Sequence, residues 1–292
     1  MESVNLSMRG RVTESAPKTK KVRSVGGSIA GLATGAAVQT GVSLGAGMGV
    51  VKAMQKFGEV PADKVKILHD AAEKALDISG MKAKGVKLEY VAETKNKIKG
   101  IKAFFADAST QIANGMNAGF ASNNKIYMPE KAIPFASFHE IGHSINYNSS
   151  AFWGKMQKMR VPAMALAFVP LIYGALTKKS VAKDGQELTK RQKLNNAIRD
   201  NAGKLSFAAM LPVLAEEAMA SIRGVKLANK VLDANLAKHV AKGNCIAYMS
   251  YLGGAIALGL AAFAGVKIKD HFIEKKAAKL AAQEQNTQTK AA

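Results

Sequence analysis

Two histidines spaced four residues apart are the side chains in this sequence whose types and spacing most clearly suggest chemistry. The stretch 138–143 reads Phe-His-Glu-Ile-Gly-His and contains the pattern HExxH. Side chains four apart share one face of a helix, so His139 and His143 can direct their imidazoles at one point. Two neutral imidazoles suit Zn²⁺, and Glu140 can act as the base that activates water there. The pattern therefore predicts a catalytic zinc site.

The residues around this pattern favour a helix. Pro134 is acceptable in a first helical turn, and an apolar stripe runs beside the histidines through Phe135, Phe138, Ile141 and Ile145. Only 5 histidines occur in 292 residues, which makes a chance HExxH rare. The alternative is a half-buried helix whose histidines only bond to neighbouring side chains.

A second group of interest is the pair Glu216-Glu217, which directly follows the apolar run 205–215. That run is about 16 Å long as a helix, too short to cross a bilayer alone. Two adjacent carboxylates at the end of an apolar helix are costly to bury unless something binds them. Zinc would bind them if this helix packs beside the HExxH helix. The alternative is a pair of exposed acids on a surface turn.

Composition and charge narrow the classes of partner. The chain has 48% apolar residues and a net charge of +21. A basic chain could bind nucleic acid, but stacking aromatics are scarce and no nucleic-acid motif is present, so we expect no such partner. Lysines beside apolar runs point instead to a lipid bilayer with anionic headgroups. The single cysteine, Cys245, excludes an intrachain disulfide and a cysteine-based zinc site, and we expect it to be a small buried hydrophobe.

Three apolar runs are candidate membrane segments. Residues 24–51 carry no charge and repeat glycine every four residues, which predicts a Gly-rich membrane helix packed closely on others, or else a flexible linker. Residues 161–177 contain two prolines and predict a membrane helix or re-entrant hairpin, with a buried core helix as the alternative. Residues 243–267 predict a transmembrane helix with Tyr248 and Tyr251 near one membrane interface.

The remaining segments complete the organisation. Residues 1–23 are expected to be a disordered basic arm, 52–160 a catalytic region, 178–204 a basic connection, 205–225 the helix that carries the glutamates, and 275–292 a flexible tail. Short strands are predicted at 86–92 and 125–128. A turn at 122–124 predicts a hairpin just before the HExxH helix, and its edge strand could hold a substrate backbone by strand addition.

The motifs together resemble one class of metallopeptidase. The metzincin extension is excluded because Asn146 and Ser149 stand where it requires Gly and His. The chain resembles the gluzincin kind of zincin, whose third ligand is a glutamate in an E-x-x-A-[SD] helix, and 217–221 reads Glu-Ala-Met-Ala-Ser. It is most similar to membrane-bound neutral zinc metallopeptidases, which share an Asn-Ala strand (117–118 here) and an Arg-Val-Pro entry into an apolar segment (160–162 here). The resemblance covers about residues 115–225.

The resemblance implies roles for individual residues. Glu140 would be the catalytic base, and Zn²⁺ would be held by His139, His143 and Glu217, with Glu216 as the alternative third ligand. The substrate-binding strand would consist of Asn117, Ala118, Gly119 and Phe120. Tyr147 and Arg223 are candidates for a donor that stabilises the oxyanion.

The sequence thus predicts a membrane-bound, zinc-dependent endopeptidase, integral and multi-pass, that acts on polypeptides. The expected fold is mainly α with a small antiparallel β-sheet, a zincin-like metalloprotease core and two to four membrane-associated helices. The alternative is a catalytically inactive zincin-fold membrane scaffold. The intact Glu140 favours the enzyme, since an inactive site has no need of the base. A basic nucleic-acid-associated protein would leave the run at 243–267 unexplained.

Overall fold

The computed structural model describes residues 24–58, 62–94, 97–98, 107–114, 118–121, 123–130, 135–182 and 186–291, without the side chains of 42–58, 62, 108, 284 and 288–291. The predictions for the arm 1–23 and for Asn117 therefore lie outside the described residues. The elements are α1 Val25–Gly58, α2 Ala62–Ile78, β1 Lys87–Val91, α4 Ala108–Ala113, β2 Gly119–Ala121, β3 Lys125–Pro129, α5 Ala136–Ser149, α6 Ala151–Lys158, α7 Arg160–Leu176, α8 Lys190–Asp200, α9 Ala202–Ala209, α10 Leu211–Val231 and α11 Ala234–Ala291.

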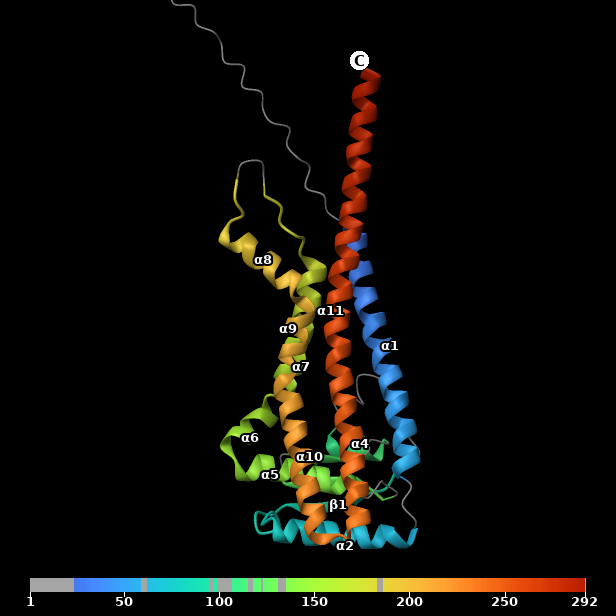
Figure 1. The fold of residues 1–292 in the computed structure, drawn as a ribbon, viewed down its shortest axis with the longest axis vertical. Coiled ribbons are helices and arrows are strands. Elements are labelled where there is room, and N and C mark those ends of the chain that lie inside the picture. Colours follow the sequence, from blue (N-terminus) through green and yellow to red (C-terminus); the bar gives the residue numbers. More distant parts are fainter. Residues whose placement is uncertain are drawn as a thin grey trace, which may run out of the picture.

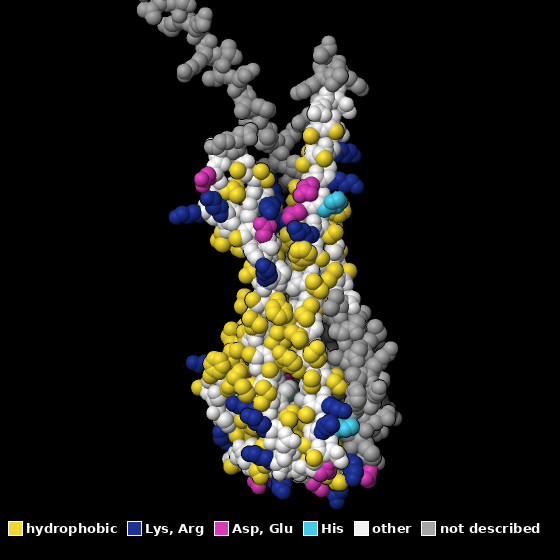
Figure 2. All heavy atoms as spheres, viewed as in Figure 1, with side chains coloured by type: hydrophobic (Ala, Val, Ile, Leu, Met, Phe, Trp, Pro, Cys, Tyr) yellow, Lys and Arg dark blue, Asp and Glu magenta, His cyan; other side chains and the backbone are white. Residues whose placement is uncertain are grey.

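The molecule is an elongated helical bundle with a small mixed unit at one end. Helices α1, α7, α9, α10 and α11 run along its length, while α2, the sheet, α5 and α6 gather at the lower end in Figure 1 and α8 lies towards the other end. Hydrophobic side chains cover the middle of the face seen in Figure 2, and charged side chains lie towards both ends. The prediction of a mainly helical fold is confirmed.

Two helical stretches in the described part of the chain are long and apolar enough to cross a membrane. They are Ala202–Val231, with 30 residues, and Ala234–Thr287, which contains the predicted segment 243–267. Helices α6 and α7, bent by 49° at their junction, form a third if they count as one span. The run 205–215, too short to cross alone, lies within the first of these stretches, because α9 and α10 extend the helical stretch beyond both of its ends.

The sheet is mixed, so the expectation of an antiparallel sheet was wrong for one pair of strands. The strand order is β1-β3-β2, with β1 parallel to β3 and β2 antiparallel to β3. The residues from 92 to 124 separate β1 from β3, and a connection of that length permits a parallel crossover. The predicted hairpin is β2–β3, and its turn places Asn124 at φ 61°, a left-handed conformation that Asn tolerates.

Three further expectations differ from the structure. The connection 178–204 contains α8, which begins at a capping box formed by Thr189 and Gln192. The tail 275–292 is helical to Ala291, because its alanines, lysines and glutamines favour a helix and no glycine or proline interrupts it. Cys245 is exposed rather than buried, because it lines an open groove between α10 and α11.

Glycines let the long helices approach one another closely. A Cβ at Gly31 of α1 would lie 2.6 Å from the carbonyl oxygen of Gly265 in α11. A Cβ at Gly203 of α9 would lie 2.8 Å from the carbonyl oxygen of Gly259 in α11. Contacts this short exclude any side chain, so α11 packs backbone to backbone against helices on two sides. This arrangement fits the small-residue packing expected of the first glycine ladder; a membrane location for α1 stays a prediction.

Replacing one of these glycines by alanine should separate crowding from helix propensity. Alanine in a helix interior is normally stabilising by about 0.5–1 kcal/mol relative to glycine. We expect Gly31→Ala to destabilise the protein by about 1–3 kcal/mol, because the new methyl group displaces α11. Gly41→Ala, in the same helix but with no atom within 4 Å of the new Cβ, is the matched control. The free energy of unfolding in detergent is measured for both variants. Equal changes in this free energy would contradict the close contact between Gly31 and α11.

Candidate metal site

Helix α5 carries the HExxH pattern and has two different faces. Phe138 and Ile141 are fully buried in a core cluster that also includes Leu76 of α2 and Ile126 of β3. The opposite face carries His139 and His143, which are 6% and 4% exposed. The apolar stripe therefore fixes the rotation of the helix, and both imidazoles face α10.

Helix α10 crosses α5 at backbone contact. A Cβ at Gly142 would lie 2.0 Å from the carbonyl oxygen of Ala220, and a Cβ at Gly224 would lie 2.4 Å from that of Phe138. No other residue type fits either position without moving a helix. This crossing places Glu216 and Glu217, which are 1% and 0% exposed, against the histidines.

Three acceptor atoms meet where the helices cross. Nε2 of His139 lies 3.0 Å from Nε2 of His143 and 3.1 Å from Oε2 of Glu217, and the remaining distance, from His143 Nε2 to Glu217 Oε2, is 3.5 Å. A tetrahedral metal ion with bonds of about 2.0–2.1 Å holds its ligand atoms roughly 3.3–3.4 Å apart. The triangle therefore has the size of one face of such a site.

The outer nitrogens of the imidazoles have partners of their own. His143 Nδ1 donates to Glu216 Oε1 at 2.8 Å, and Asn146 Nδ2 donates to the same oxygen at 2.8 Å. His139 Nδ1 lies 3.1 Å from Ser221 Oγ. Such partners orient a metal-binding imidazole and make it a stronger ligand. Glu217 is thus the carboxylate that faces the inner nitrogens of both imidazoles, while Glu216 contacts the outer nitrogen of His143.

The electrostatics of the site favour a positive charge between the converging atoms. A carboxylate only accepts hydrogen bonds, so His143 Nδ1 carries a hydrogen and the neutral ring presents a lone pair at Nε2. Burial lowers the pKa of His143, but Glu217 and Glu216 more than offset it and raise the pKa to about 10. The converging acceptors therefore attract either a proton or a metal ion. The buried group His139, Glu140 and His143 can hold a metal ion.

Glu140 lies between this site and the edge of the sheet. It is 8% exposed, and one of its oxygens lies within 4.8 Å of the ligand atoms of His139 and His143. Its Oε2 accepts the backbone N–H of Phe120 at 2.8 Å. Phe120 is in β2, the edge strand, and its N–H points away from β3. The edge of β2 that no described strand pairs with therefore faces Glu140.

Arg160 and Tyr251 are site residues for which the sequence predicted no role in this site. Arg160 Nη1 lies 2.5 Å from Oε1 of Glu217, the oxygen that does not face the histidines. The ring of Tyr251 lies 5.2 Å from the guanidinium of Arg160. The position of Arg160 in the sequence could have indicated its role, because it is the cation at the start of an apolar segment. A buried carboxylate such as Glu217 needs a positive charge nearby. Nothing in the sequence links Tyr251 to the site.

The two predicted oxyanion donors occupy other positions. Tyr147 packs edge-on against Phe120, with ring centroids 5.7 Å apart, and so lies beside the edge strand. Arg223 is on α10, where its charge interacts with Glu216 behind His143. Of the predicted substrate strand, Gly119 and Phe120 are in β2 and Ala118 directly precedes it. The structure thus brings His139, Glu140, His143 and Glu217 together with the edge of this strand.

Comparisons of the chain with models of known protein families, with curated proteins and with solved structures find no match. The site is therefore argued from its own geometry.

The two glutamates should differ sharply in their effect on metal binding. Glu217→Gln removes the charged donor from the triangle, so we expect metal to be lost. Glu216→Gln leaves all three donors in place and weakens only the support of His143, so we expect affinity to fall about 10- to 100-fold. Competition with a chromophoric chelator measures both, with circular dichroism as the check of folding. Equal effects, or a larger effect of Glu216→Gln, would contradict this assignment.

Proposed function

We propose that the protein is a membrane-bound, zinc-dependent endopeptidase of the gluzincin kind. The observation that carries the proposal is the triangle of His139, His143 and Glu217 donor atoms with Glu140 beside it. Two imidazoles and one carboxylate leave a fourth position for water, which is the ligand pattern of catalytic rather than structural zinc. Oxygen-only ligands would suit magnesium or calcium, whereas imidazole favours zinc among the common candidates.

The residues around the metal position then have separate tasks. Zn²⁺, when bound, polarises a carbonyl group and lowers the pKa of water. Glu140 takes the proton of the attacking water and returns it to the leaving amine. Arg160 holds the rear oxygen of Glu217, which leaves Oε2 for the metal position. Glu216 and Ser221 hold the two imidazoles in orientation.

The edge strand supports a polypeptide as the substrate. An extended peptide can pair with the free edge of β2 through main-chain hydrogen bonds. The N–H of Phe120 is the donor at this edge, and Glu140 now occupies it at 2.8 Å. A peptide that pairs with β2 would take over this donor, which frees Glu140 to act as the base. Substrate binding and activation of the base would thus be coupled through one hydrogen bond.

The position of the site along the bundle supports a substrate close to the membrane. Arg160 is the first residue of α7, and Glu217 lies two residues after the end of the apolar run 205–215. Helix α7 is about 25 Å long, close to the thickness of a bilayer core. If the apolar middle seen in Figure 2 lies in the bilayer, the site lies near the headgroups at one surface. We therefore propose an integral, multi-pass protein that cleaves at the membrane surface.

The function is tested with Glu140→Gln. The zinc-loaded protein in detergent is incubated with a peptide library prepared from membrane proteins, and new termini are counted by mass spectrometry. We expect the variant to keep its zinc and to lose activity by about 10²–10⁴-fold, the range for a lost general base. Glu187→Gln, at an exposed surface position, is the control and should cleave normally. Absence of new termini with the zinc-loaded wild type would favour the inactive zincin-fold scaffold.

A further inference from the structure

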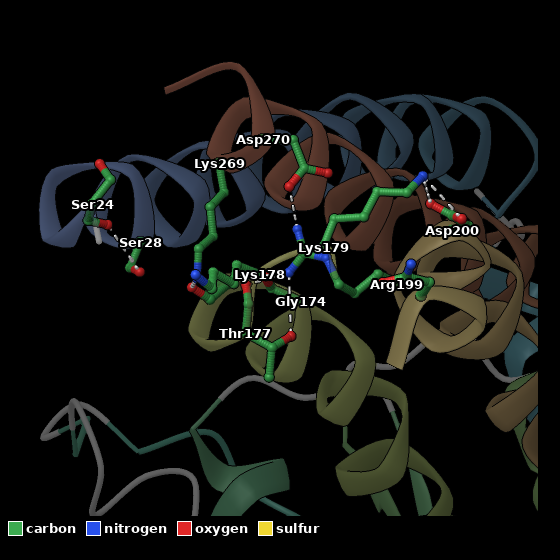
Figure 3. A network of polar contacts seen from close by, with 12 residues as sticks. Ser24, Ser28, Gly174, Thr177, Lys178, Lys179, Arg199, Asp200, Lys269 and Asp270 are labelled. Atoms are coloured by element: carbon green, nitrogen blue, oxygen red, sulfur yellow. Dashed lines mark hydrogen bonds and ion pairs between the residues drawn. The ribbon is translucent and has the colours of Figure 1, made fainter. Parts of the chain in front are cut away.

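A second polar cavity lies at the end of the bundle opposite to the metal site. It has a volume of about 400 Å³ and is formed where the start of α1, the end of α7 and α11 meet. The polar residues that line it are Ser24, Ser28, Thr177, Lys178 and Lys269. Figure 3 shows Lys269 extending from α11 to the end of α7, with Ser24 and Ser28 nearby on α1. Three hydroxyl groups and two ammonium groups thus surround one space.

Lys269 is a buried cation without a carboxylate partner. The residue is 4% exposed, and its ammonium group donates to the carbonyl oxygen of Ala175. Among the residues that the structure describes, no carboxylate lies within ion-pair distance of it. An ammonium group has three donors, and a buried charge is costly unless an opposite charge balances it. Lys269 can therefore bind an anion in this cavity.

The neighbouring carboxylate is already engaged. Arg199, which is 2% exposed, binds Asp270 and also donates to the carbonyl oxygen of Gly174 at 2.6 Å and to Thr177 Oγ1 at 3.2 Å. Arg199 thus neutralises Asp270 and binds the last carbonyls of α7 (Figure 3). This arrangement holds Thr177 at the cavity and pairs Asp270 with Arg199, so that Lys269 has no ion pair of its own among the described residues.

The start of α1 adds donors to the same cavity. Ser24 caps the helix by accepting the N–H of Gly27 at 2.8 Å, while the amides of Val25 and Gly26 precede the first helical acceptors. The amino end of a helix attracts anions through these free amides and its dipole. Lys178 is exposed at the rim.

We propose that this cavity binds a phosphate group, presented by the headgroup of an anionic phospholipid. The donors that recognise phosphate are the ammonium groups of Lys269 and Lys178, the hydroxyl of Ser24 and a helix amino end, while the hydroxyls of Ser28 and Thr177 donate to backbone carbonyl oxygens and line the cavity as polar groups. The lipid source follows from depth, because the cavity comes directly after the apolar part of α7 and the run 243–266 of α11. When the apolar middle of the bundle lies in the bilayer, the lipid headgroups lie at the level of this cavity. The proposal does not depend on the metal site or the peptidase function.

Binding is measured on the full-length protein in a neutral detergent. Dihexanoyl-phosphatidylglycerol, dihexanoyl-phosphatidylcholine and inorganic phosphate are titrated separately, below the critical micelle concentrations of the lipids, by calorimetry. We expect one saturable site for the phosphatidylglycerol, with much weaker binding of the other two. Lys269→Gln should weaken it about tenfold or more, because a charged hydrogen bond is lost. Lys178→Gln should weaken it severalfold and, being exposed, should not disturb folding.

Lys267→Gln is the matched control. It removes the same charge from the same helix at nearly the same depth, but Lys267 is exposed and its ammonium group lies over the ring of Phe263. We expect the Lys267→Gln variant to bind phosphatidylglycerol as tightly as the wild type does. If Lys269→Gln does not fold, the comparison of lipid binding by Lys178→Gln and by Lys267→Gln tests the site.

The outcomes separate the possible ligands. Absence of saturable phosphatidylglycerol binding, or equal losses in Lys178→Gln and Lys267→Gln, would overturn the site. Inorganic phosphate binding as tightly as the lipid would overturn the lipid source and make a soluble phosphate the ligand.

Discussion

The backbone contact between α5 and α10 is the constraint on which the candidate metal site depends. Gly142 and Gly224 bring the two helices to a separation that no side chain could share. At this distance Glu217 reaches both imidazoles, while Glu216, one residue earlier, reaches the outer nitrogen of His143. Burying these two carboxylates would be strongly unfavourable without cations. Arg160 supplies one positive charge, and a metal ion between the three donor atoms would supply the rest.

The sequence predicted which side chains meet at the candidate site better than it predicted their surroundings. HExxH and the glutamate helix are local patterns, so their spacing alone placed His139, His143 and the two glutamates on helix faces. The choice between Glu216 and Glu217 depends on how α10 is rotated against α5, which is a property of packing. The same is true of Tyr251, which lies far along the chain and reaches the site only because α11 packs beside α10 and α7.

The fold likewise divides into features that local sequence determines and features that depend on packing between distant segments. Helices and the β2–β3 hairpin follow from local periodicity and turn residues, and both were predicted. The parallel pairing of β1 with β3 depends on contacts between distant strands, so the expectation of an antiparallel sheet was wrong. The length of the helix that carries the glutamates was underestimated: it was expected at 205–225, whereas α10 continues to Val231.

The two ends of the bundle resemble one another in physical terms. At each end an arginine near α7 binds a carboxylate: Arg160 binds the buried Glu217 at one end, and the buried Arg199 binds the partly exposed Asp270 at the other. The balance of charge differs, however. Acceptors predominate around His143, which suits a cation, whereas Lys269 has an excess positive charge, which suits an anion. The apolar middle of the bundle separates the two (Figure 2).

X-ray absorption spectroscopy of the zinc-loaded, full-length protein tests the central claim most directly. The account predicts one tightly bound zinc with four nitrogen or oxygen ligands at about 2.0–2.1 Å, two of them imidazoles. The imidazole contribution should be lost in part in His143→Ala. A six-coordinate zinc without imidazole scattering, or no retained zinc after zinc is supplied, would contradict it.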